Sequence, residues 1–198
     1  EGYAALPGTE TGYAFTVDTK PEDIVENVEP ATGDPVVDMS AIPEESRDAA
    51  ETVAKSVEDK GELAAAANSV LNTVTEEDKA AAKQALIDSK DVTVGDDDQV
   101  YTYVQTYLDI KPTAYGADKQ TFTLDITPMY RVVASTADKA QDIEVVGETS
   151  GTANAVVLEG SEMELNSLKT MTISVTLPNE WTGTEVYVQH KNNEYVAT

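Results

Sequence analysis

Two similar stretches decide how this chain folds: YLDIKPTAYG at residues 107–116 and FTLDITPMYR at residues 122–131. Each contains Leu-Asp-Ile, one further residue and Pro. In an extended strand the Leu and Ile share one face and the Asp lies on the other. Two such strands, paired antiparallel through a loop at residues 113–119, would place Asp109 and Asp125 diagonally on the face opposite the core. The prolines mark where the ladder stops or reaches a sheet edge. We therefore interpret the likeness as one strand pattern used twice, not as a duplicated ligand site.

The second half of the chain is predicted to be rich in β-strands. From Asp91 onward apolar residues recur with period two, and Gly, Pro and Asn separate the segments. Many short strands with this spacing are typical of an antiparallel Ig-like β-sandwich. The strands are expected at residues 91–94, 100–110, 121–126, 130–134, 142–146, 153–158, 170–177, 185–190 and 194–197, the last two joined by a hairpin turn at Asn192-Asn193.

Residues 43–89 instead show the 3.6-residue period of helices. Pro43 suits the first position of a helix that ends at Lys60-Gly61. A second apolar stripe covers residues 63–74. The third helix begins at Thr75, where Thr-Glu-Glu-Asp resembles a capping box with Asp in place of Glu. The stripes are rich in Ala, so these helices need another apolar surface to build a core.

Together these patterns predict an α+β chain in two parts. Residues 1–90 hold a strand at residues 13–17, a short apolar run at Val36-Val37, a weak helical turn over residues 24–28, and the segment of two or three short helices. This part would pack on the sandwich or be inserted into it. Residues 91–198 would form the antiparallel Ig-like β-sandwich itself.

The composition is that of a folded and strongly acidic protein. The 198 residues include 37 acidic and 13 basic side chains, for a formal net charge of −24. Such a charge repels phosphate backbones and anionic lipids, so nucleic acid partners and membrane insertion are not expected. With no cysteine, the chain has no disulfides and no thiol nucleophile. A salt-adapted intracellular protein would share this acidity, but the Thr-rich strands fit a secreted protein better.

The last hundred residues resemble a known kind of module. The resemblance rests on YLDIKPTAYGADKQTFTLDITPMYRVVAS, NAVVLEG and above all the ending MTISVTLPNEWTGTEVYVQHKNNEYV. These runs are similar to repeat modules of large secreted surface proteins of Gram-positive anaerobic bacteria, which carry S-layer-homology or sorting sequences. The resemblance implies an Ig-like β-sandwich on a cell surface and no catalytic residues. The chain starts at Glu1 and stops after a strand-like run, so we expect a processed or excised module.

Some Gram-positive surface domains contain intramolecular Lys–Asn isopeptide bonds. Lys169 precedes a predicted strand, and Asn192 or Asn193 near the end has the partner residue type. The pairing is not readable from the sequence, and an intact mass lower by one ammonia would reveal the bond.

No set of residues for an enzyme of the common classes is evident. The only histidine, His190, lies on a predicted strand just before a turn. A hydrolase triad would require it, and a zinc site would have to rely on carboxylates alone. No Gly-rich phosphate loop or Gly-x-Ser-x-Gly elbow is present. We therefore predict no enzyme activity, and a glycosidase built only on carboxylates remains the open alternative.

Calcium is the one metal that the sequence brings into consideration. Asp96, Asp97 and Asp98 follow Gly95 and offer the oxygen ligands that calcium prefers. Adjacent carboxylates do not converge on one ion without a special loop. A solvated turn that breaks a sheet edge with charge is therefore the preferred interpretation.

Tyrosines provide the main binding hypothesis. The candidate residues share one face of the predicted strand pair: Tyr101, Tyr103, Tyr107, Asp109 and Asp125. Aromatic rings beside carboxylates can stack on sugars. The alternative, which we prefer, is that these tyrosines are ordinary sheet residues that cover one face or pack against the helices. Trp181 is similarly expected to plug a loop at the end of the sandwich.

The expected function follows from these predictions. We expect a non-catalytic structural or adhesive module of an extracellular protein that is associated with the bacterial cell surface. Its partners would be other modules of the same protein, with an extracellular glycan or a host protein as further candidates. The alternative function is a carbohydrate-binding module that uses an exposed Tyr face. No cofactor is expected apart from the calcium considered above.

Overall fold

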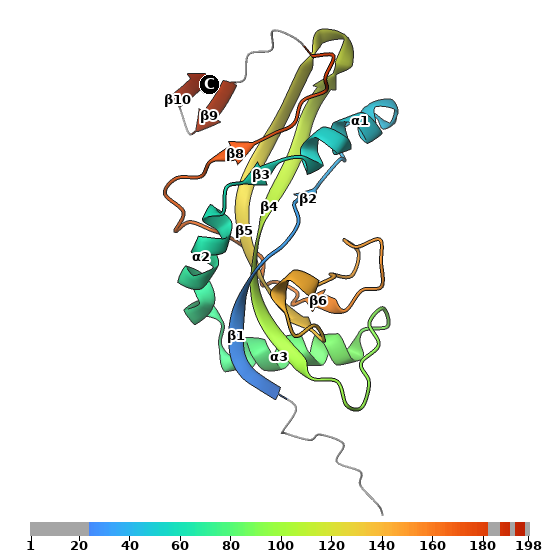
Figure 1. The fold of residues 1–198 in the computed structure, drawn as a ribbon, viewed down its shortest axis with the longest axis vertical. Helices are drawn as coiled ribbons and strands as arrows, with labels where there is room; N and C mark the ends of the chain where they lie inside the picture. Colours follow the sequence, from blue (N-terminus) through green and yellow to red (C-terminus); the bar gives the residue numbers. More distant parts are fainter. Residues whose placement is uncertain (1–23, 182–186, 191–192, 197–198) are drawn as a thin grey trace, which may run out of the picture.

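A hairpin of two long strands forms the centre of the structure. β4 (Val100–Gly116) and β5 (Thr121–Ser135) pair antiparallel along nearly their whole length. The computed structural model describes residues 24–181, 187–190 and 193–196, and in it the hairpin runs along much of the long axis (Figure 1). The predicted pairing of the two Leu-Asp-Ile stretches is confirmed, because Asp109 lies diagonally across from Asp125.

Shorter strands extend the hairpin into a mixed sheet. They are β1 (Ile24–Thr32), β2 (Val36–Val37), β6 (Ala155–Val157) and β7 (Met163–Glu164), which with β4 and β5 make six. The remaining strands are β3 (Glu58–Asp59), β8 (Ile173–Ser174), β9 (Tyr187–His190) and β10 (Asn193–Val196). β1 and β2 pair in parallel with β4, whereas β6 and β7 pair antiparallel with β5. The six-stranded sheet has the order β1-β4-β5-β6, with β2 beside β4 and β7 beside β5. Two small pairs, β3–β8 and β9–β10, lie outside it.

Three α-helices connect β2 to β4: α1 (Glu44–Lys55), α2 (Glu62–Val70) and α3 (Glu76–Asp88). The parallel pairing of β1 with β4 requires a long crossover, and these helices supply it. Figure 1 shows α3 lying across the lower end of the hairpin. Thr75 caps α3 as predicted, since its hydroxyl accepts the Asp78 N–H and the Asp78 carboxylate accepts the Thr75 N–H. Within the described residues, none of the helices has the length and apolar composition to cross a bilayer.

The predicted Ig-like β-sandwich is wrong. A sandwich needs two facing sheets, but the described residues form one six-stranded mixed sheet with three helices, a mixed α/β fold. Two predicted strands, at residues 121–126 and 130–134, are parts of the single strand β5. The segments at residues 91–94 and 142–146 hold no extended strand, and residues 170–177 hold only the two-residue β8.

The N-terminal predictions had mixed outcomes. The apolar run at Val36-Val37 is β2. Residues 24–28, predicted as a weak helical turn, instead belong to the strand β1. The first helix ends at Lys55 instead of Lys60-Gly61. The strand predicted at residues 13–17 lies outside the described residues.

The orientation of the prolines explains why β4 and β5 are longer than expected. Leu165 donates its N–H to the carbonyl oxygen of Pro128, so the backbone of Pro128 faces the outer edge of β5. Ile110 accepts the Asp38 N–H at the outer edge of β4, and Pro112, two residues later, faces the same way. Each missing N–H therefore points away from the β4–β5 ladder, and both strands continue through their proline.

The two faces of the hairpin pack against different parts of the chain. The face that we call the helix face packs against all three helices through Val104, Leu108, Ile110, Tyr130 and Val132. The opposite face, the loop face, carries Tyr101, Tyr103, Gln105, Tyr107, Arg131 and Val133, and residues 136–157 cover it. Packing on both faces explains why nearly every residue in this part of β4 is buried, with Thr102, Gln105 and Thr106 among them.

The hairpin has two halves that differ in cover. The base, residues 100–108 with 128–135, is buried on both faces. The arm, residues 109–116 with 121–127, buries its helix face but exposes its loop face, where Lys111, Thr123 and Asp125 meet solvent. The two halves therefore belong to one pair of strands but present different surfaces.

A bulge re-aims one aromatic residue in the arm. The register shifts between Pro112 and Ala114, which turns Tyr115 to the same side as Phe122. The Tyr115 ring then lies 5.8 Å from the Phe122 ring and 5.7 Å from the Trp181 ring, measured between centroids. These rings fix the C-terminal part of the chain to the tip of the arm.

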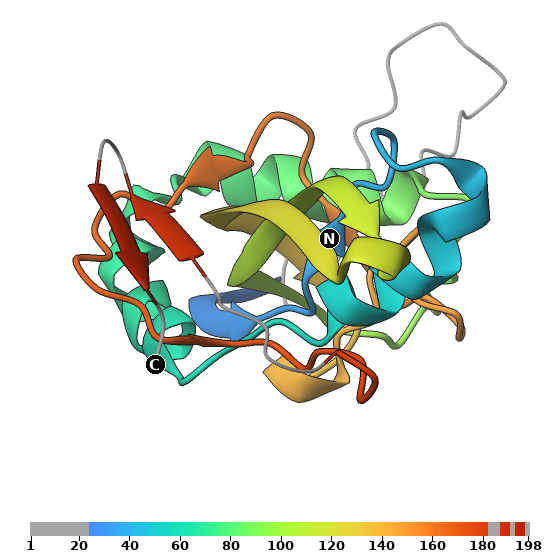
Figure 2. The same cartoon turned by 90° about the horizontal axis from the view of Figure 1, so that it is seen from above.

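Residues 165–181, which we call the strap, run from β7 to the tip of the arm. The strap passes α2, where the hydroxyls of Ser167 and Ser69 lie 3.1 Å apart. The strand β8 belongs to the strap and pairs with β3. It ends at Trp181. Figure 2, which looks along the molecule from above, shows this segment passing on the outside of the hairpin and helices.

Candidate functional site

The tyrosines of the predicted ligand site lie in the base and not on an open surface. Tyr103 is 0% exposed and Tyr107 is 3% exposed, whereas Tyr101 is half-buried. The Tyr103 hydroxyl donates to the Ala137 carbonyl oxygen at 2.8 Å, and the Tyr107 hydroxyl donates to a Glu162 carboxylate oxygen at 2.9 Å. Stacking on a sugar needs an open ring face, which Tyr103 and Tyr107 lack.

The two aspartates of that predicted site lie in the arm, on either side of a lysine. Lys111 forms an ion pair with Asp109 at 2.8 Å and lies directly opposite Asp125 on the neighbouring strand. The hydrogen bond to Asp109 and the charge of that carboxylate raise the pKa of Lys111, with Asp38 and Asp125 adding to the effect. Asp109 thus has a cationic partner already, and although it follows Tyr107 on the same face, both aspartates lie in the arm while the buried tyrosines lie in the base.

The predicted calcium residues form an exposed turn before β4. Asp98 accepts the Gly95 N–H through its carboxylate at 2.7 Å, and its own N–H donates to the Gly95 carbonyl oxygen. Asp96 and Asp97 are exposed. Among the residues that the structure describes, no group of three or more His, Cys, Asp or Glu side chains is arranged to hold a metal ion. The structure therefore offers no support for calcium at this turn.

The remaining sequence candidates fall near the C-terminal end. His190 lies in β9 opposite Asn193 in β10, so the expected hairpin strands are present, and Asn192 lies outside the described residues. Trp181, at the end of the strap, is buried against Tyr115 at the tip of the arm, in line with the plug interpretation, although the fold is not a sandwich. Lys169 is exposed on the strap, and the isopeptide bond stays a prediction.

The largest cluster of charged and polar groups surrounds Arg131, which the sequence did not single out. Its guanidinium, 1% exposed, makes a bidentate pair with Glu148 at 2.5 and 2.6 Å. Nε and Nη2 donate to Gln105 Oε1 at 2.9 and 2.6 Å. Glu162 lies 4.0 Å from Nη1, and the Tyr107 ring centroid lies 4.5 Å from the guanidinium carbon. We call these five residues the Arg131 cluster.

Three parts of the chain bring the Arg131 cluster together. Gln105 and Arg131 are direct cross-strand partners in the base. Glu148 follows Gly147, whose φ of 83° permits the tight turn that directs this loop back over the sheet. Glu162 comes from the link between β6 and β7. The cluster therefore joins both central strands to the loop that covers them.

Gly33 closes the Arg131 cluster on the side of β1. Its N–H donates to the Thr106 carbonyl oxygen at 2.8 Å, which brings the link between β1 and β2 close to β4. A Cβ atom at this position would lie 2.7 Å from Cδ of Gln105. Only glycine allows this close approach without displacing the Gln105 amide that holds Arg131.

The chemistry of the Arg131 cluster is that of an anchor. Four hydrogen bonds engage the guanidinium, and Arg stays protonated in proteins, so Glu148 neutralises a permanent buried cation. Burial and the hydrogen bond to Glu162 raise the pKa of Tyr107, which keeps its hydroxyl protonated as a donor. In the described part of the chain, no buried side-chain nitrogen or oxygen lacks a partner. The guanidinium is therefore fully engaged inside the protein, and only the glutamates of the cluster reach solvent.

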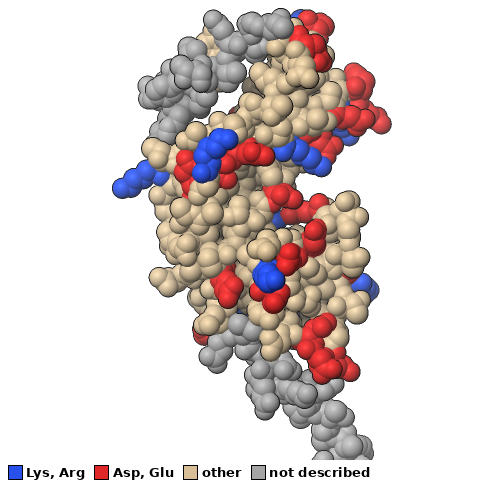
Figure 3. All heavy atoms as spheres, viewed as in Figure 1, with Lys and Arg blue, Asp and Glu red and all other residues tan. Residues whose placement is uncertain are grey.

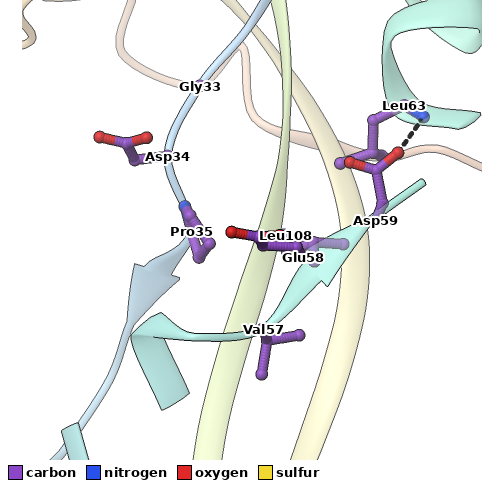
Figure 4. A pocket seen from close by; sticks show the side chains of 8 residues that line it. All are labelled: Gly33, Asp34, Pro35, Val57, Glu58, Asp59, Leu63 and Leu108. Carbon is purple, nitrogen blue, oxygen red and sulfur yellow. Dashed lines mark hydrogen bonds between the residues drawn. The ribbon is translucent and has the colours of Figure 1, made fainter. Parts of the chain in front are cut away.

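Two shallow pockets lie along the N-terminal segment, one beside the link between β1 and β2 and the other beside the end of β1. The first, of about 220 Å³, is lined by residues that include Gly33, Asp34, Val57, Asp59, Leu63 and Leu108 (Figure 4). Asp59 is engaged by the Leu63 N–H, and Asp34 points away from the apolar lining (Figure 4). The second, of about 310 Å³, is lined largely by alanines. Ligand pockets usually measure about 300–1,000 Å³ and bring a few polar groups together. These two pockets therefore define no ligand class.

Part of the Arg131 cluster could have been predicted from the sequence. The register that pairs the two Leu-Asp-Ile stretches also sets Gln105 opposite Arg131, and two long polar residues facing each other in an apolar strand pair indicate a buried bond. Glu148 and Glu162 lie on loops and carry no such signal.

Comparisons with known proteins leave the geometry as the only guide to function. No protein-family model, no curated protein and no solved structure matches this chain. The Arg131 cluster, the arm and the strap are accordingly interpreted from their contacts alone.

Proposed function

We propose that this chain is a non-catalytic structural module of an extracellular bacterial surface protein, and that it spaces its neighbours by bearing tension along its long axis. One observation carries this proposal: β1 pairs in parallel with β4 in an elongated molecule. The first described strand begins at the lower end in Figure 1, and the last described pair, β9–β10, lies at the upper end.

This geometry places β1 in shear when the two ends are pulled apart. From Val28 to Thr32, β1 runs alongside residues 102–106 of β4 in continuous register. A pull on the start of β1, toward the lower end, loads these ladder hydrogen bonds together rather than one after another. The Gly33 N–H bond to Thr106 adds a further link at the upper end of β1.

The Arg131 cluster supports the same role. Gln105, whose amide packs against Gly33, holds the guanidinium of Arg131 on β5. Tension on β1 would therefore be passed from β4 to β5 and to the covering loop through buried, charge-assisted bonds.

The acidic surface suits a spacer in a tandem array. On the face drawn in Figure 3, Asp and Glu side chains are more widespread than Lys and Arg, in keeping with the net charge of −24. Adjacent modules of like charge repel one another, which favours an extended arrangement. The proposed partners are other modules of the same protein. Glycan binding through the tyrosines is not favoured, because Tyr103 and Tyr107 are buried.

Single-molecule force spectroscopy with two loading directions tests the proposal. The chain has no cysteine, so one handle is attached at the N-terminal end and the other at a single introduced thiol. Asp118→Cys, at the tip of the hairpin, loads the β1–β4 pair in shear. Gln99→Cys, just before β4, pulls the adjacent starts of the two parallel strands apart and unzips the pair. We expect a clearly higher rupture force for Asp118→Cys, and equal forces would overturn the proposal.

A further inference from the structure

We propose that the strap is a releasable cover, which detaches from the arm and the helices while the β1–β4–β5 sheet stays folded. Its detachment uncovers the apolar helix face of the arm. The inference rests on how the strap is attached and does not depend on the proposed function.

The strap is held by few backbone bonds. Its ladder with the rest of the molecule is the two-residue pair β8–β3, with Ser174 opposite Glu58. At its start the Leu165 N–H donates to the Pro128 carbonyl oxygen, and further along side chains accept from the backbone: the Thr172 N–H donates to Glu62, and the Thr176 N–H donates to the Ser56 hydroxyl. These side-chain bonds are exposed, so water competes for them and each contributes little.

Apolar contacts hold the strap more firmly at its start than along its length. Leu165, beside β7, is buried in the core cluster beneath α1 and α2. Leu168, Met171 and Val175 are only partly buried against that same cluster. Beyond them, Trp181 and the Gln120 side chain, which donates to the Glu180 carbonyl oxygen, fix the far end to the arm.

The surface beneath the strap is apolar and belongs to the arm. Phe122, Leu124 and Ile126 pack against the same core cluster as the strap residues. The arm does not need the strap to stay paired, because β4 and β5 share a ladder that continues to the hairpin tip. Release of the strap would therefore expose a stripe of the arm without breaking the central sheet, as expected of a locally unfolding unit.

A pull from the C-terminal end would favour this release. Among the contacts of the strap itself, such a pull reaches Trp181 first, then the Thr176 and β8 contacts, and then Thr172. These attachments are met one after another, in contrast to the β1–β4 bonds that are loaded together. The same molecule thus combines a sheared strand at one end with a peeled strap at the other.

Hydrogen exchange on the full chain tests the separate opening. Under native conditions we expect the Thr172 and Thr176 amides to exchange at least about a hundredfold faster than base amides such as Val104. A Glu58→Cys/Ser174→Cys pair, placed at opposite positions of the β3–β8 ladder, locks the strap when oxidised. Oxidation should slow the two strap amides about tenfold or more relative to the reduced form, with no change at Val104.

A second disulfide variant is needed in case the Glu58→Cys/Ser174→Cys variant does not fold or does not oxidise. Ser69→Cys/Ser167→Cys replaces two hydroxyls that lie 3.1 Å apart and ties the strap to α2. Equal exchange rates in strap and base, or an unchanged strap rate after oxidation of either pair, would overturn the inference.

Thiol labelling tests whether the arm becomes uncovered. Leu124 is partly buried on the helix face of the arm and Val133 is fully buried in the base, so each labelling rate is compared with and without Trp181→Ala, which removes the contact between the strap and the arm. Trp181→Ala should speed the labelling of Leu124→Cys at least about tenfold and leave that of Val133→Cys unchanged, and an unchanged rate for Leu124→Cys would overturn the inference. The force measurement above is independent: a freely opening strap without stronger shear would leave this inference standing and remove the proposed function.

Discussion

The base and the arm of the β4–β5 hairpin use the same two strands but are stabilised by different means. In the base, helices cover one face, residues 136–157 cover the other, and the Arg131 cluster ties the layers together. In the arm, the strap and α1 adjoin the helix face, while Lys111 and the carboxylates around it keep the loop face in water.

The difference lies in the alternate positions of each strand. Both halves carry apolar residues on the helix face, so that pattern does not separate them. On the loop face of β4, Tyr103, Gln105 and Tyr107 in the base give way to Asp109 and Lys111 in the arm. Large side chains with one polar end can be buried if a second layer meets their polar atoms, whereas a charged pair stays at the surface. The loop face therefore determines where a second cover forms.

Glu148→Ala is expected to have the largest effect, because it acts on the buried half. It leaves the Arg131 guanidinium without its bidentate partner, and Arg131 cannot lose its charge. Breaking a buried pair in this way costs about 3–5 kcal/mol of unfolding free energy. Urea unfolding followed by circular dichroism measures the loss.

Arg131→Met is the matched control. It removes the buried cation and leaves Glu148, whose side chain is 32% exposed and can regain water. We therefore expect Arg131→Met to destabilise the protein less than Glu148→Ala does. The reverse order would contradict the assignment of Arg131 as the buried member of the pair.

Gly33→Ala tests the closure of the base from the side of β1. The new Cβ would lie 2.7 Å from Cδ of Gln105, so the amide that holds Arg131 must shift. Overpacking of this kind costs about 1–3 kcal/mol. Gly151→Ala, where the nearest atom lies 3.5 Å away, should change the unfolding free energy by no more than about 0.5 kcal/mol. Similar losses for the two variants would show that Gly33 is not a close-packing position.

The sequence predicted the local elements better than their assembly. The capping box at Thr75, the phase of the β4–β5 pairing and the diagonal placement of Asp109 and Asp125 all follow from short-range rules, and all were confirmed. The predicted sandwich was wrong because β1 pairs in parallel with a distant strand. Ala31 lies opposite Gln105, about 75 residues away in the chain, and no local sequence pattern indicates such a pairing.

The candidate site was predicted only in part, for a similar reason. The tyrosines and aspartates were placed correctly on one face, but alternation does not show which half of that face is covered. The cover comes from residues 136–157, and Glu148 becomes a partner of Arg131 only through the turn at Gly147. Loop residues carry no periodic signal, so the charge that completes the Arg131 cluster was not foreseen.

Tyr103→Phe probes the cover on the loop face. At neutral pH the loss of the hydrogen bond to the Ala137 carbonyl oxygen should cost about 0.5–1.5 kcal/mol. Burial, with a smaller contribution from Glu29, raises the pKa of Tyr103 from 10.0 to about 12. The folded protein therefore keeps a proton that the unfolded chain loses, so this stability is complete below pH 10 and declines as the pH rises toward 12.

The pH dependence separates burial from the hydrogen bond. Thermal unfolding between pH 8 and 12 (a range of about four units around the shifted pKa) should show a weaker alkaline decline for Tyr103→Phe than for the parent chain. An identical decline in both proteins would mean that residues 136–157 do not exclude water from Tyr103.

Trp181→Ala is expected to have the smallest effect on global unfolding, because it acts on the exposed half. A buried tryptophan in a core would cost about 3–5 kcal/mol when truncated. Trp181 is buried only between the strap and the ring of Tyr115 at the tip of the arm. If the strap opens before the base unfolds, this contact is already lost at the global transition. The free energy of global unfolding should then fall by less than about 1 kcal/mol.

The same substitution should nevertheless change the strap. Loss of the contact with Tyr115 shifts the local equilibrium toward the open form, so the Thr176 amide should exchange faster while the Val104 amide does not. A matched Val133→Ala variant in the base should lower the free energy of global unfolding by about 1 kcal/mol or more and leave the relative exchange of the strap unchanged. If Trp181→Ala instead lowered the global midpoint as much as Val133→Ala does, base and arm would be one cooperative unit and the contrast between the two halves would be structural but not energetic.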